Sequence, residues 1–547
     1  MKLWRYLIET LGTQGLAIVL LGLFSGVTNA ATVASFGRLL ADHQSLPSSS
    51  LVWPAGCILA AVLSDLAAKG WFIRLGATAM SNVRRDLVRQ ILQRPFHQLE
   101  RIGTARLLAA LTDDVAKISQ TLGNLPTVLI AVVTTSGCFL YLAYLSPGLM
   151  AVSLTIGLPV AWGCMALHRR ARPYVRAAFQ ARDAAFEHFR SLTEGIKELK
   201  LNSARRQAFV NELLEPELAA LRGRVAAARL WYQLSVTGSQ MSVFFLMLGI
   251  LAFTKWLPVD AEVLTTFAVV MLYSKTAVQA ILSWLPTYSE AETAIVNLEA
   301  VGFSLSVPPQ VHPEVAPAEL PTRHVQLDLA GVCFRYATDT AADSDGSFAL
   351  GPLDLTFQSG EVVFVAGGNG SGKTTLMKLL IGLYTPSGGT IRLNGMQIAE
   401  HNREMYRQQF SVVFADFYLF EQLLGLDADD LPTRAGEYLE QLELADRVTV
   451  SGDSLSTTRL SHGQRQRLAL LTAYLEDRPI YVFDEWAANQ DPKFRDVFYR
   501  QILPELKSRG KLVIVISHDD RYFNLADRLI QLTDGLLAAP SPSQAAA

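Results

Sequence analysis

Charge and cysteine are both scarce in this chain of 547 residues. Only 18% of the residues are charged, half are hydrophobic, and the formal net charge is -2. The four cysteines include no close pair, which argues against a disulfide framework and against a cysteine-rich zinc site. A chain of this length is expected to form two or more domains, and this composition fits one membrane part and one soluble part.

Long apolar segments dominate the first half. Each of six segments is long enough to cross about 30 Å of hydrocarbon as a helix of about 20 residues. They lie near 15–37, 51–69, 125–146, 149–168, 233–256 and 262–285. The start of the chain imitates a signal peptide, but its apolar run continues past Ala30, so we interpret it as the first span.

Basic residues between the spans predict the orientation. Lys and Arg are concentrated at 74–117 and 169–206, whereas the linkers 42–50, 147–148 and 257–261 contain none. Basic segments next to spans stay on the cytoplasmic side, so both termini are predicted to be cytoplasmic. The two basic segments are also patterned as helices, so we expect helices that extend from the membrane well into the cytoplasm.

The pattern changes after residue 305. Five prolines predict a stiff linker at 306–322. Short Val/Ile/Phe-rich runs then alternate with helical segments, which predicts an α/β domain at 323–537. The expected strands lie at 325–336, 361–368, 390–395, 411–417, 480–485 and 511–518. The final segment, 538–547, is predicted to be a disordered tail.

A phosphate-binding loop follows the second of these strands. The pattern G-x-x-x-x-G-K-T precedes a helical segment, which is the context that the motif requires. Its main-chain N–H groups would surround phosphate oxygens, Lys373 would reach the β and γ phosphates, and Thr374 would bind Mg²⁺. We therefore predict ATP and Mg²⁺ as cofactors. The predicted binding residues here are Gly367, Gly368, Asn369, Gly370, Ser371, Gly372, Lys373, Thr374 and Thr375.

Two adjacent carboxylates end the strand at 480–485. Asp484 would hold Mg²⁺, directly or through water, and Glu485 would orient and deprotonate the attacking water. Such a pair is only moderately specific by itself. After a phosphate-binding loop, it indicates nucleotide hydrolysis.

The segment Leu460 to Gln464, LSHGQ, resembles the LSGGQ signature of ABC ATPases. The resemblance extends over nearly the whole chain. It implies a six-helix type I ABC exporter membrane domain at 1–305, followed by an α/β P-loop ABC ATPase domain. The segments around Gly103 and Gly195 look like the two intracellular loops of such exporters, whose short helices dock on the ATPase.

The resemblance also implies roles for single residues. Ser461, Gly463 and Gln464 would contact the nucleotide bound by a second protomer, so the chain is expected to work as a homodimer with two composite sites. Tyr336 matches the aromatic residue that stacks on adenine. His518 matches the histidine that contacts the γ-phosphate, and it joins Glu485 and Lys373 as a catalytic residue. Residues 488–491 occupy the loop that touches the opposite protomer.

The sequence differs from the usual ABC ATPase motifs at three places, and these differences indicate a subgroup of the family. Ala415 stands where a glutamine is usual, with Asp416 after it, so that Asp416 takes part of the glutamine's role or the coupling is tuned differently. His462 replaces a glycine, and WAA at 486–488 replaces Pro-Thr-Ser. With these features the motifs resemble the cyclic-peptide exporters of Gram-negative inner membranes, which include microcin, syringomycin-type lipopeptide and pyoverdine-precursor exporters.

The expected function is ATP-driven export of a peptide natural product across the bacterial inner membrane. A pyoverdine-type siderophore peptide is the first choice, and a lipopeptide or a microcin-like toxin is the alternative. A soluble ABC ATPase of repair or translation disagrees with the six spans, and importers usually carry their spans on separate chains. Expected partners are membrane lipid and periplasmic or outer-membrane export components, but no nucleic acid. No leader-cleaving peptidase is expected before the first span.

Two ionisable residues lie deep in the predicted spans. Asp65 in the second span and Lys275 in the sixth are each about 20 Å from the outer end of their helix. Such residues usually face the bundle interior and pair with one another. We therefore predict that the two can meet at one depth as a structural ion pair. The alternatives are that Lys275 bonds to backbone carbonyls, or that one or both residues line the export path.

Overall fold

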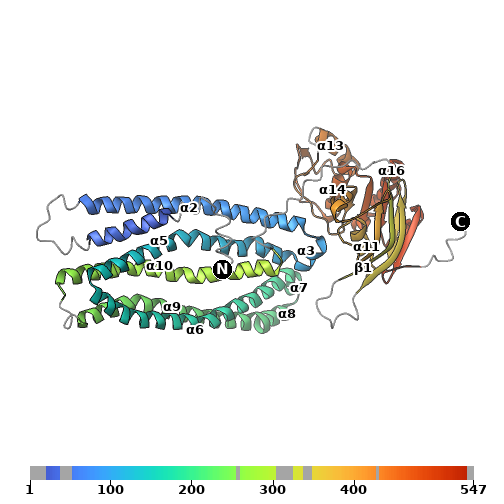
Figure 1. The fold of residues 1–547 in the computed structure, drawn as a ribbon. Coiled ribbons are helices and arrows are strands. Elements are labelled where there is room, and N and C mark those ends of the chain that lie inside the picture. The colour runs from blue at the N-terminus through green and yellow to red at the C-terminus, as the bar shows by residue number, and fades with distance from the viewer. Residues whose placement is uncertain are drawn as a thin grey trace. The chain divides into compact units, whose positions relative to one another are not determined.

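The computed structural model describes residues 20–36, 52–253, 259–303, 324–336, 348–426 and 430–538. Contacts divide the chain into two compact units, both drawn in Figure 1. One unit comprises Met1–Leu92 and Ile102–Pro309, and the other comprises Gln93–Arg101 and Gln310–Ala547. The predicted linker at 306–322 lies outside the described residues, as does all of the predicted tail beyond residue 538.

Long helices build the first unit. They are an unlabelled helix at Leu20–Phe36, α2 (Val52–Gln93), α5 (Val115–Leu145), α6 (Pro147–Glu194), α9 (Glu215–Phe253) and α10 (Ala261–Ala300). Shorter helical segments connect them: α4 (Thr104–Ala109), η2 (Ala110–Asp114), α7 (Ile196–Leu201), α8 (Ser203–Ala208) and η3 (Phe209–Leu214).

Five stretches of the described chain are long and apolar enough to cross a membrane. They are Val52–Trp71, Thr104–Leu145, Pro147–Leu167, Ser203–Phe253 and Ala261–Ala300. They cover most of the second to fifth predicted spans and all of the sixth. The helix at Leu20–Phe36 is a shorter apolar helix and covers the described part of the first predicted span.

These helices are longer than a bilayer requires. α6 has 48 residues, which corresponds to about 70 Å, more than twice the hydrocarbon thickness. It begins at Pro147, where the Ser146 side chain accepts a hydrogen bond from Leu149 N–H and caps the helix. The helix thus continues without a break from the apolar segment into the basic residues of 169–194.

The helices pack in pairs. α5 lies beside α10, and α6 lies beside α9 (Figure 1). Ile118 and Leu122 of α5 share a buried apolar cluster with Ala291 and Ile295 of α10. Gly26 allows a closer approach to α5, since a Cβ atom there would lie only 2.5 Å from Val133 Cβ. Small residues often permit such contacts between membrane helices.

Two sheets form the frame of the second unit. A four-stranded antiparallel sheet has the order β2-β1-β4-β5, and a six-stranded sheet has the order β12-β11-β3-β10-β9-β6. In the larger sheet, β6, β9, β10, β3 and β11 are parallel. The strands are β1 (Gln326–Arg335), β2 (Ala349–Gln358), β3 (Val362–Gly367), β4 (Gly388–Leu393), β5 (Met396–Gln397), β6 (Phe410–Val413), β9 (Ile480–Asp484), β10 (Leu512–Ile516), β11 (Arg528–Thr533) and β12 (Leu536–Leu537), with a hairpin of β7 (Val450–Ser451) and β8 (Ser454–Leu455).

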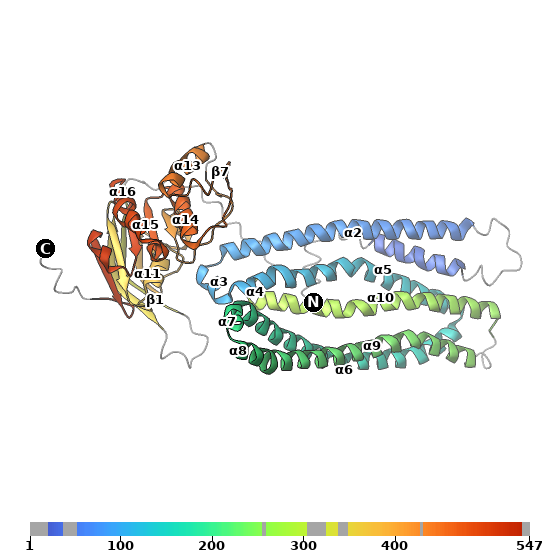
Figure 2. The same cartoon turned by 180° about the vertical axis from the view of Figure 1, so that it is seen from behind.

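Alternate residues of the central strands point into two separate cores. Phe364 and Phe483 face one core, while Val363 and Val482 face the other. The first core is covered by a group of helices that Figure 2 shows together: α13 (Leu431–Gln441), α14 (His462–Glu476), α15 (Pro492–Val497), η8 (Phe498–Ile502) and α16 (Leu503–Ser508). The second core lies under α11 (Lys373–Leu380) and the antiparallel sheet. Central strands that are buried on both faces are typical of parallel sheets.

One helix from the first half of the sequence belongs to the second unit. α3 (Phe96–Ile102) lies almost entirely within residues 93–101 of that unit. Glu100 accepts hydrogen bonds from Lys378 Nζ, at 2.8 Å, and from the Tyr384 hydroxyl. The Phe96 ring packs 6.4 Å from the Tyr384 ring, between centroids. The segment just before Gly103 therefore packs against the rest of the second unit.

Candidate nucleotide site

The phosphate-binding loop connects β3 to α11. The backbone is left-handed at Gly370 (φ 79°) and Gly372 (φ 100°), and a Cβ at Gly372 would lie within 2.8 Å of both the Leu350 and Phe348 side chains. Only glycine fits there without strain. No side chain caps the start of α11, so its first N–H groups are available for an anion.

Lys373 is held inside this loop. It is 6% exposed, and its Nζ donates to the carbonyl oxygens of Gly367 (3.1 Å) and Gly368 (2.9 Å). Burial lowers the pKa of Lys373, and the charges of Glu485 and Asp484 oppose that shift. The Ser371 hydroxyl is buried and has no hydrogen-bond partner among the described residues. A cation and a free hydroxyl together fit a bound phosphate group.

Asp484 and Glu485 lie where β9 ends. Asp484 is 5% exposed, and its pKa is raised to about 6, first by burial and then by the charge of Glu485. The main-chain N–H of Ala415 works in the opposite direction, while the charge of Asp416 adds to the rise. Ala415 and Asp416, the residues that depart from the family pattern, therefore do lie close to the acidic pair.

His518 contacts the second acid directly. Its Nε2 lies 2.9 Å from Glu485 Oε1. Glu485 has a left-handed backbone at φ 48°, which is unusual for a residue with a side chain and is common at functional sites. A cavity of about 310 Å³ opens beside this pair, lined also by Arg495, Ser517 and Asp519.

The predicted adenine-stacking residue lies near α11. Tyr336 is 41% exposed, and its hydroxyl lies 3.1 Å from Thr375 Oγ1. Its ring packs edge-on against Phe334 (5.1 Å) and Tyr384 (6.0 Å). These contacts hold the ring in place and leave part of it accessible to a base.

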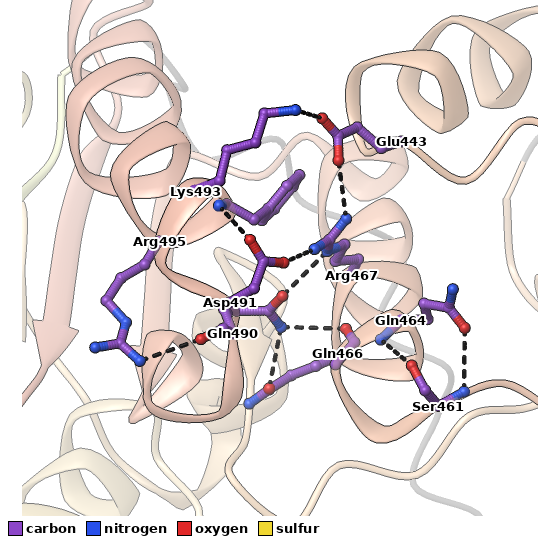
Figure 3. Close-up of polar contacts among 11 residues, drawn as sticks. Glu443, Ser461, Gln464, Gln466, Arg467, Gln490, Asp491, Lys493 and Arg495 are labelled. Carbon is purple, nitrogen blue, oxygen red and sulfur yellow. Dashed lines mark hydrogen bonds and ion pairs between the residues drawn. The ribbon is translucent and has the colours of Figure 1, made fainter.

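The signature residues lie at the start of α14. Ser461 caps the helix by accepting a hydrogen bond from Gln464 N–H, and Gln464 Oε1 accepts one from Ser461 N–H (Figure 3). His462 Nε2 lies 3.3 Å from Asn489 Nδ2. Ser461 is exposed, and no contact joins it to Lys373 within the described part of this protomer.

The predicted site residues therefore form two groups. Lys373, Asp484, Glu485 and His518 meet at the carboxyl ends of β3, β9 and β10, which are neighbours in the sheet. That edge of a parallel sheet is the usual place for ligands. The second group is the signature turn, where Ser461 is exposed and Gly463 and Gln464 are partly buried, so Ser461 is accessible to another molecule.

The sequence did not predict the contacts by which Arg467 and Gln490 connect the signature helix to the 488–491 loop. Arg467 is buried and pairs with Asp491 and with Glu443, while its guanidinium lies 3.7 Å from the centre of the Phe494 ring. Gln490 bonds to the same helix (Figure 3). The basic run after the signature was the only available signal, because contacts between separate segments leave no motif.

The predicted pairing of Asp65 with Lys275 is wrong. Asp65 forms an ion pair with Lys69, one helical turn along α2, at 2.7 Å. Lys275 Nζ lies over the Phe244 ring, 5.1 Å from its centre. Two residues at equal depth can still face different directions on their helices. Asp65 pairs with Lys69 and Lys275 contacts Phe244 instead.

Comparisons with known proteins agree with this architecture. Residues 16–278 match the ABC transporter transmembrane region, and residues 350–488 match the ABC transporter family. The chain is 35% identical over 532 residues to the ATP-binding protein SyrD of Pseudomonas syringae pv. syringae, covering 95% of this chain and 93% of that relative.

Two further matches are more distant. An ATP-dependent lipid A-core flippase of Alkalilimnicola ehrlichii is 27% identical over 84% of this chain and 79% of that relative. A solved structure of a bacterial Atm1-family ABC exporter with ATP bound has a TM-score of 0.73 and 16% identity, and the match covers 98% of this chain and 95% of that chain. This last match shows the fold.

Together, the apolar helices and the phosphate-binding site define an ATP-hydrolysing, multi-pass membrane transporter. The chain belongs to the ABC transporter family, as an exporter half-transporter with one membrane domain and one ATPase domain. The predicted fold class is thus confirmed.

Proposed function

We propose that this chain exports a peptide natural product across the bacterial inner membrane, with both termini in the cytoplasm. The observation that carries the proposal is the full-length similarity to SyrD, which spans both domains. The likeness of the motifs at 367–374, 460–464 and 484–491 to those of cyclic-peptide exporters supports a peptide. A pyoverdine-type siderophore precursor is our first candidate, and a lipopeptide or microcin-like toxin is the second.

We further propose that two copies assemble into the working transporter. Ser461 of the signature turn is exposed, and no hydrogen bond joins it to Lys373 of its own chain within the described structure. In a homodimer, the turn of one protomer would complete the nucleotide site of the other. Export components of the periplasm or outer membrane are further candidate partners.

The residues of one site fit distinct steps. The N–H groups of the 367–372 loop and the Lys373 ammonium bind the phosphates, and Tyr336 stacks on the adenine. Glu485 accepts a proton from the attacking water, while His518 Nε2 holds the Glu485 carboxylate in place at 2.9 Å. Residues 488–491 lie beside the signature helix and would face the other protomer.

Thr374 and Asp484 suit a magnesium ion. A hydroxyl and a carboxylate oxygen are ligands that Mg²⁺ prefers, and Asp484 is a buried acid whose raised pKa a cation would reverse. Mg²⁺ bound there would neutralise charge on the transferred phosphate.

A deletion strain tests the proposed substrate class. Secreted and intracellular metabolites of the deletion strain and its parent would be compared by mass spectrometry, with complementation by the wild-type gene and by Glu485→Gln. We expect one peptide to disappear from the medium, and only the wild-type gene to restore it. Unchanged secretion of every peptide, in a strain shown to produce them, would contradict the proposal.

Lipid transport is the second candidate function. The similarity to lipid A-core flippases over 84% of the chain favours it. Purified protein in vesicles with a fluorescent lipid would distinguish the two functions. ATP-dependent movement of the lipid, together with normal peptide secretion in the deletion strain, would favour the lipid.

A further inference from the structure

Gln490 connects the last residues of the 488–491 loop to the signature helix. Its side-chain Nε2 donates to the Gly463 carbonyl (3.1 Å) and to Gln466 Oε1 (3.2 Å), and its Oε1 accepts from Arg467 Nε (3.1 Å). Gln490 is 4% exposed. Figure 3 shows all three bonds meeting at the amide of this one side chain. They hold the first turns of α14.

The main-chain carbonyl of Gln490 is connected, through Arg495, to the loop that contains His518. Arg495 Nη2 donates to the Gln490 carbonyl at 3.1 Å, and Arg495 Nη1 lies 3.4 Å from Asp519 Oδ2. Asp519 directly follows His518, which holds Glu485. Gln490 thus touches the signature turn with its side chain and, through Arg495, the loop of the hydrolytic pair.

A second path reaches Glu485 through the backbone. Gln490 N–H donates to the Ala487 carbonyl at 3.2 Å, and Ala488 N–H donates to the Glu485 carbonyl at 3.1 Å. These bonds belong to the 3-10 turn η7 (Trp486–Asn489). The Trp486 indole is buried and donates to the Gln466 carbonyl at 2.9 Å. The turn is therefore fixed to α14 at both ends.

We propose that Gln490 is a positioning residue for ATP hydrolysis. It keeps the signature turn at Gly463 and the Glu485–His518 pair in a fixed relation, so that the two move together. This link lies within one protomer. Its consequence rests on the proposed homodimer: the turn serves one nucleotide and the hydrolytic pair serves the other, so each protomer couples the two sites.

Substitution of Gln490 tests the link through kinetics. In full-length protein reconstituted without transport substrate, Gln490→Met should lower kcat about tenfold and change KM for ATP less than about twofold, because the phosphate-binding loop is intact. Gln490→Glu keeps an acceptor for Arg467 but cannot donate to Gly463. In protein shown by circular dichroism to be folded, this variant should therefore still show the low kcat.

Arg500→Met is the matched control, since Arg500 forms an exposed ion pair with Asp496, one helical turn away. Its kcat should equal that of the wild type. Normal kcat in Gln490→Met, or full recovery of kcat in Gln490→Glu, would overturn the proposal. If Gln490→Met does not fold, the Glu variant decides by itself.

A double-mutant cycle separates one link from two independent contacts. Arg495→Met should also lower kcat, and the double variant with Gln490→Met should be no slower than the slower single variant. Multiplied losses of about 100-fold would show independent effects and contradict the link. None of these measurements involves a peptide or the identity of the exported compound, so failure here and failure of the export assignment are distinguishable.

Discussion

Asp484 and Glu485 are neighbours in sequence, yet their surroundings differ. Asp484 is almost completely buried, whereas the Glu485 side chain is 41% exposed and faces His518. The left-handed backbone at Glu485 turns its side chain away from the strand direction. One acid is therefore suited to a cation in a dry position, and the other to a water molecule that enters from solvent.

This difference predicts the effect of Glu485→Gln. The phosphate-binding loop and Asp484 are untouched, so ATP binding should remain, while hydrolysis falls by at least about 100-fold because the water loses its base. Nucleotide binding and phosphate release measure the two effects separately. Lys373→Ala, by contrast, should weaken binding itself. Hydrolysis at the wild-type rate in Glu485→Gln would rule out the role of base.

Asp484→Asn should stabilise the nucleotide-free protein at neutral pH. The pKa of Asp484 is raised from 3.8 to about 6, so the native state binds its proton more tightly than the unfolded chain does. Stability from this group is present below about pH 4 and is lost as the pH rises through 6. The asparagine variant avoids that loss, which is at most about 2–3 kcal/mol.

Melting temperatures of the purified full-length protein at pH 4.5 and pH 8 would check this. The advantage of the asparagine variant should be large at pH 8 and small at pH 4.5. Val413→Ala, on neighbouring β6, is a buried apolar control whose effect should not depend on pH. An equal advantage at both values would show that the Asp484 charge is not the cause.

The sequence identifies site residues whose identity depends on a local motif. Lys373 opens a helix after a strand and a glycine-rich loop, and Asp484 ends a strand, so spacing alone predicts both positions. Gln490 and Arg467 could not be found in this way, because their contacts join segments about 25 residues apart through the fold. Asp65 was paired wrongly for the same reason, since its rotation about the α2 axis depends on packing.

Among the elements, uniformly apolar strands were the easiest to predict. β9 and β10 are buried at every position and read as continuous apolar runs. β2 and β11 were missed: β2 is interrupted by Gly351 and Pro352, and β11 alternates exposed and buried residues over a short length. Edge and irregular strands depend on partners that a single sequence does not reveal.

α3 gives the ATP-binding unit a contact with residues from the loop between the second and third spans. Burial works to raise the pKa of Glu100, but hydrogen bonds from Lys378 and Tyr384 outweigh it, so the pKa is lowered and the acid stays charged. Tyr384 in turn packs against Tyr336. α3 is thus connected to α11 and to the predicted adenine contact.

Glu100→Gln should separate ATP hydrolysis from export. Loss of the charge weakens the docking of α3 by about 1 kcal/mol, because charged hydrogen bonds contribute about that much when partly exposed. Basal ATPase activity of the purified protein should stay within about twofold, while export in the complemented deletion strain falls. Glu404→Gln, which removes the charge of an exposed acid that pairs with Arg407, is the control. Equal export by both variants would contradict a coupling role.

For the whole transporter, the separation of the two residue groups predicts complementation between defective copies. Protomers with Ser461→Arg, mixed with protomers with Lys373→Ala, should form dimers in which both lesions fall on one site and the other site is intact. Activity above that of either variant alone, measured as ATP hydrolysis of the mixture, is expected. A mixture no more active than its components would contradict either the shared site or the sufficiency of one site.

The protein is synthesised from its N-terminus, so α3 is made long before the surface on which it docks. Residues 93–101 emerge from the ribosome about 220 residues before β1, which corresponds to about 10–45 s at ordinary rates of synthesis. During that interval the apolar helices of 104–300 are made, while the surface that will receive α3 does not yet exist. An ATPase fragment expressed without the first half would carry the Tyr384 and Lys378 surface uncovered. The membrane half therefore supplies part of the ATPase fold itself.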